Sequence, residues 1–314
     1  MLKAAPRLSV AVHSFLLYCE SKNLSPRTVE WYSRHLRDCL VQLGDIAADS
    51  VTPDHLRELV THFLRNHEQS PDLPPRDGGR GLSPNTVNGS IRALKTFFNF
   101  LVEEGILAQS PAKRIPKLKT PLERGTVLTT DELTCLIQRS NGNSFTEKRN
   151  RALLILLADT GIRIGELTGL KTSDIDWGDR TLSVMGKGRK TRSVPFGRQA
   201  ARALSSYLSV YPSDCSADSP LFLNAHGDPL TLRRAQHIVS AMARRAGITD
   251  RRISPHAFRR TFATLWISNG GDPFSLQRLL GHTTMEMVNR YVRLSTADLR
   301  KSHAIVGPID RLRS

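Results

Sequence analysis

Cysteine is scarce in this chain of 314 residues, which has only Cys19, Cys39, Cys135 and Cys215. The four lie far apart, with no C-x-x-C pair and no regular ligand spacing between them. A disulfide framework or a zinc site is normally marked by such pairs. We therefore predict reduced, mostly buried thiols in a reducing compartment.

Long apolar runs are also missing. The apolar stretch near the N-terminus is interrupted by His13 and Ser14, and no small-residue cleavage site follows it. A membrane span needs about 20 apolar residues, and a secretory signal needs a cleavage site. The sequence predicts neither, so we expect an intracellular protein, cytoplasmic and associated with the nucleoid.

Acidic residues are few, and no grouping of three of them suggests a two-metal site. We therefore expect no metal and no cofactor. Lys and Arg number 45 against 29 Asp and Glu, which gives a net charge of +16. This excess favours a nucleic acid as partner over a membrane surface, because no long basic amphipathic helix is present.

The positive charge is unevenly distributed. Residues 1–120 carry 16 basic and 12 acidic side chains, whereas residues 121–314 carry 29 and 17. The C-terminal part is therefore expected to contact most of the phosphates of a nucleic acid.

Helix signals dominate the first part of the chain, and we predict a four-helix domain over residues 1–112. Apolar spacing marks residues 8–19, while S-P, T-P and S-P pairs at residues 25, 52 and 83 open three further helices. Two of these helices share S-P-x-T-V, followed by Arg34 in one and Arg92 in the other. A reused helix start and a true duplication both explain this pattern. We place Arg34 and Arg92 among the candidate DNA-binding residues.

A basic linker is predicted over residues 113–121. The stretch P-A-K-R-I-P-K-L-K-T-P-L-E-R-G, residues 111–125, has three prolines, five basic residues and no periodicity. An extended linker of this kind can follow a DNA backbone, or it can simply be solvated. Its candidate DNA contacts are Lys113, Arg114, Lys117 and Lys119.

Residues 122–314 predict a mainly α domain with a small three-stranded antiparallel sheet. Residues 173–197 alternate around W-G-D and G-K-G turns, which is typical of short strands joined by hairpins. The surrounding segments read as helices, among them a buried one that ends at Gly161.

Four segments of this domain carry candidate chemistry. Arg163 and Glu166 lie three residues apart on one helix face, and Lys187 stands at a hairpin tip beside Arg189 and Lys190. His256 and Arg259 project from the first turns of another helix, where an anion is favoured, and His282 precedes Tyr291 by nine residues. Taken alone, each of these four segments is better explained as a structural or surface feature than as a site.

Together, the segments T-G-I-R-I-G-E-L, G-K-G-R-K-T-R-x-V-P, P-H-A-F-R-R-T-F-A-T and L-L-G-H…Y resemble the tyrosine recombinase family, also called phage integrases, and most of all its Xer-type members. The resemblance runs from about residue 8 to residue 294. Arg260 departs from it, since many relatives have a second histidine there, and the loop around residues 70–81 is longer than in housekeeping Xer proteins.

The resemblance implies a SAM-like core-binding domain followed by a catalytic domain of the recombinase type. It assigns the scissile phosphate to Arg163 and Arg259 with His256 and His282 beside it. It makes Lys187 the lysine of the β-hairpin, Glu166 a supporting carboxylate and Tyr291 the nucleophile.

Elementary chemistry agrees with these roles. Two guanidiniums suit the charge that spreads over the phosphate oxygens in the transition state. A tyrosine hydroxyl, with a pKa of about 10 in water, needs a base or cationic neighbours, and His256 is the candidate base. Lys187 can protonate the leaving 5′ oxygen.

The resemblance also implies a C-shaped clamp around duplex DNA and a homotetramer on two DNA sites, alone or with a related recombinase. Strands are exchanged in pairs through a Holliday junction, and the segment after Tyr291 packs on a neighbouring subunit. Because the chain begins directly with the first helical domain, we expect short, simple sites. Integration, excision, transposition and dimer resolution all remain open as the biological task. Two other hypotheses are a type IB topoisomerase-like enzyme and a catalytically silent DNA-binding relative.

Overall fold

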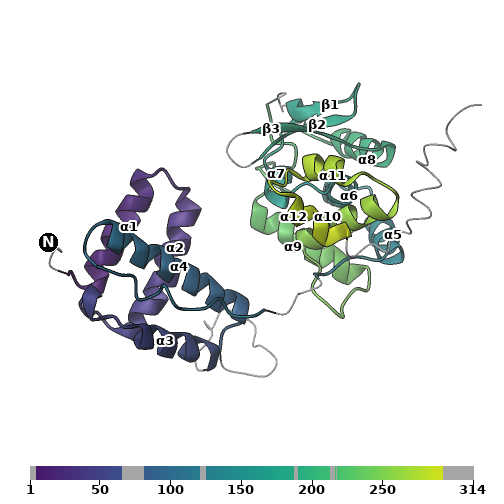
Figure 1. Cartoon of the computed structure of the whole chain (residues 1–314). Helices are drawn as coiled ribbons and strands as arrows, with labels where there is room; N and C mark the ends of the chain where they lie inside the picture. The colour runs from purple at the N-terminus through teal and green to yellow at the C-terminus, as the bar shows by residue number, and fades with distance from the viewer. Residues whose placement is uncertain are drawn as a thin grey trace, which may run out of the picture. The chain divides into compact units, whose positions relative to one another are not determined.

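The computed structural model describes residues 5–65, 81–120, 125–186, 190–212, 216 and 218–292. The chain divides into two compact units, Met1–Glu123 and Arg124–Ser314 (Figure 1). The exact limits of the domains and linker expected from the sequence stay a prediction. Among the described residues, no helix is both long and apolar enough to cross a membrane.

The first unit is a four-helix domain, as predicted. Its helices are α1 (Leu8–Ser21), α2 (Pro26–Leu43), α3 (Pro53–Arg65) and α4 (Pro84–Glu103), with a short 3₁₀ helix η1 (Ala48–Ser50) between the second and third. The helices α2 and α4 begin alike because their N-cap serines, Ser25 and Ser83, accept the N–H of Thr28 and Thr86, and a proline stands first in each helix.

Aromatic side chains fill the core of this unit. The buried ring of Phe15 contacts those of Tyr32, Phe97 and Phe100, at centroid distances of 5.2, 5.7 and 5.4 Å. The two cysteines of this unit, Cys19 and Cys39, are buried free thiols. Cys135 of the second unit is also a free thiol and is partly buried. Cys215 lies outside the described residues.

Part of the basic stretch after α4 packs on the same core. Ile115 is 3% exposed there, and Asn88 of α4 both donates to the backbone oxygen of Leu118 and accepts from its N–H, at 3.1 and 2.8 Å. The four basic residues of this stretch nevertheless face solvent: Lys113, Arg114, Lys117 and Lys119. Their exposure leaves these charges available to an anionic partner.

The second unit combines eight helices with one sheet among its described residues, confirming the predicted mainly α domain with a small antiparallel sheet, an α+β arrangement. The helices are α5 (Thr130–Arg139), α6 (Phe145–Thr160), α7 (Ile164–Thr168), α8 (Arg198–Leu208), α9 (Leu232–Arg245), α10 (Pro255–Ser268), α11 (Pro273–Leu280) and α12 (Met285–Val292), with a 3₁₀ turn η2 (Thr172–Asp174). The apolar helix α6 is buried and packs against α8 and α10.

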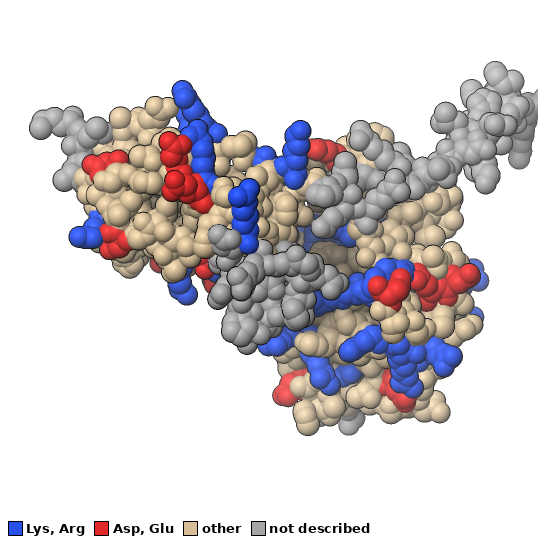
Figure 2. Space-filling model, turned by 90° about the horizontal axis from the view of Figure 1, so that it is seen from below, with Lys and Arg blue, Asp and Glu red and all other residues tan. Residues whose placement is uncertain are grey.

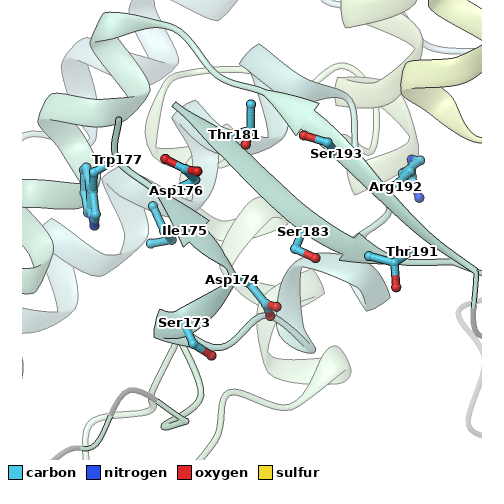
Figure 3. Close-up of a pocket in the computed structure, with 10 residues that line it drawn as sticks. All are labelled: Ser173, Asp174, Ile175, Asp176, Trp177, Thr181, Ser183, Thr191, Arg192 and Ser193. Carbon is cyan, nitrogen blue, oxygen red and sulfur yellow. The ribbon is translucent and has the colours of Figure 1, made fainter. Parts of the chain in front are cut away.

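The sheet has the order β1–β2–β3 and is antiparallel throughout, with β1 (Ile175–Asp176), β2 (Thr181–Met185) and β3 (Thr191–Pro195). Leu182 and Val184 of β2 and Val194 of β3 are buried on one face. The other face is polar, with Ser183 paired opposite Ser193, and it lines an open depression of about 600 Å³ (Figure 3). Alternation of side chains along each strand produces this division.

Candidate active site

The site begins where α6 ends. Gly161 closes that helix in a left-handed conformation (φ 61°), which a glycine adopts without strain, and the chain turns into α7 with Arg163 as its N-cap. The backbone N–H of Arg163 donates to Glu166 Oε2 at 2.8 Å, and its Nη1 donates to Oε1 at 2.9 Å. The structure thus brings Arg163 and Glu166 together, while the arginine side chain stays 39% exposed.

Glu166 is the buried centre of a three-residue ion-pair network. Its side chain is 7% exposed, and Arg192 of β3 donates to both carboxylate oxygens, at 3.0 and 2.8 Å. Burial acts to raise the pKa of Glu166, but the hydrogen bonds and charges of Arg192 and Arg163 outweigh it, and the pKa lies below its usual range. The carboxylate is therefore ionised at neutral pH.

Arg192 is a residue that the sequence interpretation missed. It pairs with Glu166, and its Nε also donates to the backbone oxygen of Leu279 at 2.9 Å. The signal was present in the strand pattern, because Arg192 stands two residues before the buried Val194 and so shares its face of the sheet. A charged residue on the inward face of a strand indicates a buried partner.

Arg259, in α10, is buried at 5% exposure. Its Nη1 and Nη2 donate to the backbone oxygens of Gly161 and Leu280, at 2.8 and 2.6 Å. Burial, together with the nearby charge of Arg163, lowers the pKa of Arg259 to about 10, so it remains cationic at neutral pH. Among the described residues it forms no salt bridge, which leaves its charge free to attract an anion.

Both candidate histidines lie near these arginines. The pKa of His256, in the first turn of α10, is lowered mainly by burial away from water and secondly by the charges of neighbouring arginines. The same causes, burial first, lower the pKa of the 8% exposed His282 to about 4. The arginines that act on His282 are Arg259, Arg163 and Arg192. Both imidazoles are therefore neutral at pH 7.

Tyr291 lies on α12 beside His282. The two rings are nearly parallel, with an interplanar angle of 15° and a centroid distance of 6.2 Å. Tyr291 is half-buried against an apolar cluster of α10, α11 and α12, and the pKa of Arg259 responds to its proximity. His282 Nδ1 is buried without a hydrogen-bond partner among the described residues, a feature that functional sites often show.

The structure therefore brings Arg163, Glu166, His256, Arg259, His282 and Tyr291 into one region of the second unit. Lys187 and Arg189 lie outside the described residues. Lys190 is exposed, and a hydrogen bond of 2.9 Å from the N–H of Gly186 to its backbone oxygen closes the described end of the hairpin. The catalytic roles of these residues stay a prediction.

The candidate DNA-binding arginines of the first unit are both exposed. Arg92 places its guanidinium over the ring of Trp31, with a distance of 4.5 Å to the centroid, and Arg34 lies on the same helix as this tryptophan. Lys and Arg side chains lie on the viewed surface of both units (Figure 2). Stacking restricts the motion of an arginine and prepares it for a planar contact.

The sequence profile of the phage integrase family matches residues 126–298. A tyrosine recombinase XerC from Pelobacter propionicus is 32% identical over 285 residues, covering 90% of each chain. A second XerC, from Bacillus pumilus, is 31% identical over 299 residues, covering 93% of this chain and 94% of the relative.

Solved structures of recombinases share the fold. The Tn1549 transposon integrase in complex with a circular intermediate DNA has a TM-score of 0.74 at 20% identity, covering 98% of this chain and 100% of that chain. A lambda integrase dimer bound to a core site has a TM-score of 0.73 at 18% identity, covering 95% and 79%. At such identities the likeness concerns the fold alone.

Proposed function

The chain belongs to the phage integrase family and is a tyrosine recombinase, and from this premise we propose that it cuts and rejoins specific sites in duplex DNA through Tyr291. The observation that carries the proposal is the meeting of Tyr291 and His282 beside Arg259, a buried cation without a salt bridge among the described residues. An anion that enters this region gains two guanidiniums and lies next to a phenol.

The chemistry follows from the groups present. The Tyr291 oxygen bonds to the scissile phosphorus as the bond from phosphorus to the 5′ oxygen breaks. The phenol proton passes to His256, whose lowered pKa keeps it neutral and able to accept it, and the leaving oxygen takes a proton from Lys187. The product is a 3′-phosphotyrosine, which a 5′-hydroxyl of a second DNA strand attacks to reverse the steps without ATP.

Arg163 and Arg259 are the residues that stabilise the charged phosphate oxygens. Fixed donors are effective because they need no reorganisation when charge develops. Two backbone oxygens hold Arg259, and Glu166 holds Arg163. His282, neutral and buried, can offer a ring N–H to the same oxygens. Glu166 supports the site and does not contact DNA.

Assembly is the second part of the proposal. A lambda integrase tetramer bound to a Holliday junction has a related fold, with a TM-score of 0.70 at 18% identity. We infer that four copies of this chain, or this chain with a related recombinase, act on two sites and exchange strands in pairs. The two units would close around the duplex as a clamp, and the enzyme would work on cytoplasmic, nucleoid DNA for a mobile element or for dimer resolution.

The test is covalent trapping on a suicide duplex, which loses a short fragment after cleavage and cannot be religated. Wild-type protein should give an adduct in a denaturing gel, and peptide mapping should locate the DNA on Tyr291. Tyr291→Phe should bind the duplex with nearly unchanged affinity and give no adduct, because only the nucleophilic oxygen is lost. An adduct that persists in Tyr291→Phe would show that another residue is the nucleophile.

Two controls distinguish this function from a metal-dependent nuclease, from a type IB topoisomerase-like enzyme and from a catalytically silent DNA-binding protein. Trapping in excess EDTA should proceed unchanged, because arginines and a lysine replace the metal ions of a nuclease. Relaxation of a supercoiled plasmid without a site should be weak. Strong relaxation would instead favour a type IB topoisomerase-like activity, and binding without any adduct would favour a silent DNA-binding protein.

A further inference from the structure

We propose that Arg192 is a positioning residue for DNA cleavage, which holds Arg163 through Glu166 and fixes the turn that carries His282. The proposal rests on the proposed function, since it assigns a role to a residue within that reaction. Arg192 lies in the G-K-G-R-K-T-R-x-V-P segment, but the sequence analysis gave it no role. The evidence for a role comes from the contacts that its side chain makes.

Arg192 connects three separate segments. From β3 its Nη1 and Nη2 reach the two oxygens of Glu166 on α7, at 3.0 and 2.8 Å, and its Nε reaches the backbone oxygen of Leu279 on α11 at 2.9 Å. The arginine and glutamate side chains are only 16% and 7% exposed. A bidentate pair of this kind fixes direction as well as distance, which a lysine cannot do.

Glu166 transmits this order to Arg163. Each of its carboxylate oxygens accepts one hydrogen bond from Arg192 and one from Arg163, so one carboxylate serves two arginines. Without Arg192, Arg163 would be the only cation hydrogen-bonded to Glu166 among the described residues, and the carboxylate would be free to turn toward it. The guanidinium of Arg163 would then no longer be fixed in direction. Glu166 would also neutralise more of its positive charge, which would weaken its attraction for a phosphate.

Arg192 also holds the end of α11. Its contact with Leu279 is followed by the contact of Arg259 with the next backbone oxygen, that of Leu280. Gly281 then turns the chain (φ 62°), and His282 follows directly. The two arginines thus donate to successive backbone carbonyls at a helix C-terminus, where cations are favoured. Together these contacts position His282.

The position of Arg192 on β3 extends this coupling toward the hairpin. β3 is the strand that returns from the G-K-G-R-K stretch, and Arg192 also borders the open depression over the sheet, where its side chain points away from those of Thr191 and Ser183 (Figure 3). The strand that follows Lys187 in the sequence is therefore tied by one side chain to the phosphate-binding region.

The experiment compares Arg192→Met with Arg251→Met. Arg251 also forms an ion pair in the second unit, with Nη2 at 2.6 and 2.7 Å from the oxygens of Glu132, and it is not part of the candidate site. Thermal unfolding is measured for both variants, to record the loss of an ion pair. Single-turnover cleavage of the suicide duplex at saturating protein, and the DNA dissociation constant, are measured on the same samples.

Arg192→Met should cleave about 10- to 100-fold more slowly, with little change in DNA affinity, because small displacements of catalytic groups have effects of this size. Arg251→Met breaks a more exposed ion pair, so it should lose less thermal stability than Arg192→Met, and it should cleave at the wild-type rate. Arg192→Lys, which keeps the charge without the bidentate contact, should lie between wild type and Arg192→Met. It also supplies the test if Arg192→Met does not fold.

A double-mutant comparison separates positioning from simple structural support. If Arg192 acts partly through Arg163, the loss of Arg192 should slow cleavage less in an Arg163→Ala background than in the wild type. The two slowing factors should differ by about threefold or more. An equal factor in both backgrounds, or wild-type cleavage by folded Arg192→Met, would overturn the proposal while leaving the proposed function intact. A wild-type protein that forms no adduct would overturn both.

Discussion

The two units treat charge in opposite ways. In the described part of the first unit, the buried polar side chains are the hydroxyls of Ser90 and Ser110, and every charged side chain reaches solvent. The second unit buries Arg149, Arg259 and His282 to between 4% and 8% exposure. Burial of a charge opposes folding unless it is compensated. Backbone oxygens compensate both arginines, of which Arg259 belongs to the candidate site, and His282 is buried there in its neutral form.

Arginine illustrates the difference between the units. Arg92 is exposed and stacked on Trp31, which suits a contact made on DNA binding. Arg259 is buried and held by two backbone oxygens, which suits a contact with a reacting group. We therefore expect changes in the first unit to alter binding, and changes in the second to alter the rate of cleavage.

The largest selective effect on cleavage is expected from Lys187→Ala. If Lys187 protonates the leaving 5′ oxygen, its loss should slow cleavage by roughly 10²–10⁴-fold, the usual contribution of a positioned acid. The defect should largely vanish on a duplex whose scissile bridging oxygen is sulfur, because a thiolate leaves without a proton. Single-turnover cleavage of both duplexes measures this.

Arg163→Ala is the matched control for this sulfur rescue. In the proposed mechanism the charge of Arg163 stabilises the non-bridging oxygens, so sulfur at the bridging position should not restore the activity of this variant. Rescue of both variants, or of neither, would mean that Lys187 is one more phosphate-binding cation. His256 would then be the first alternative proton donor.

Arg259→Ala should slow cleavage by about 10²–10³-fold, the usual effect of removing one preorganised donor. Arg92→Ala, the matched change in the first unit, should weaken binding and leave cleavage at saturating protein near the wild-type rate. Gel-shift affinity and single-turnover rates on the same duplex measure the two effects. If Arg92→Ala slowed the saturated rate as much as Arg259→Ala does, the division of roles between the units would be wrong.

The elements that were predicted correctly depend on local chemistry. The S-P helix starts appear at Ser25 and Ser83 because a serine oxygen and a following proline fix a helix N-terminus within one turn. The sheet follows from short alternating segments between turns. Such signals need no knowledge of distant parts of the chain.

The features that were missed depend on distant pairing. Arg192 and Glu166 are 26 residues apart, and nothing in the intervening sequence indicates that they meet. Composition also described only part of the basic stretch after α4. Its prolines and charges suggested an extended linker, yet Ile115 enters the core and Leu118 pairs with Asn88.

Acidification should slow cleavage. Burial and nearby arginines lower the pKa of His256 below its usual 6.5, so the neutral base form predominates at pH 7 and is lost only as the pH falls through the lowered value. Rates should therefore stay flat through the usual titration range of an imidazole and decline only at more acid pH, where His256 becomes protonated. Single-turnover rates at saturating protein between pH 5 and 8 measure this, with His256→Gln as the control that should be slow without the same decline. A rate that rises on acidification would contradict a role for His256 as base.

The smallest effect on cleavage is expected from the exposed cations of the first unit. If the exposed residues Lys113, Arg114, Lys117 and Lys119 contact phosphates, as we propose, neutralising them together should weaken binding to all DNA sequences alike. The slope of log affinity against log salt should flatten by roughly 0.9 for each phosphate that the variant no longer neutralises. Cleavage at saturating protein should stay at the wild-type rate, since these residues lie in a unit that buries no charge among its described residues.

Binding measured from low to high salt, on a cleaved site and on unrelated DNA, tests the first point, and the single-turnover rate at saturating protein tests the second. An altered choice of site at an unchanged salt slope would mean that this stretch reads bases. A slowed saturated rate would mean that the first unit also acts on the chemical step.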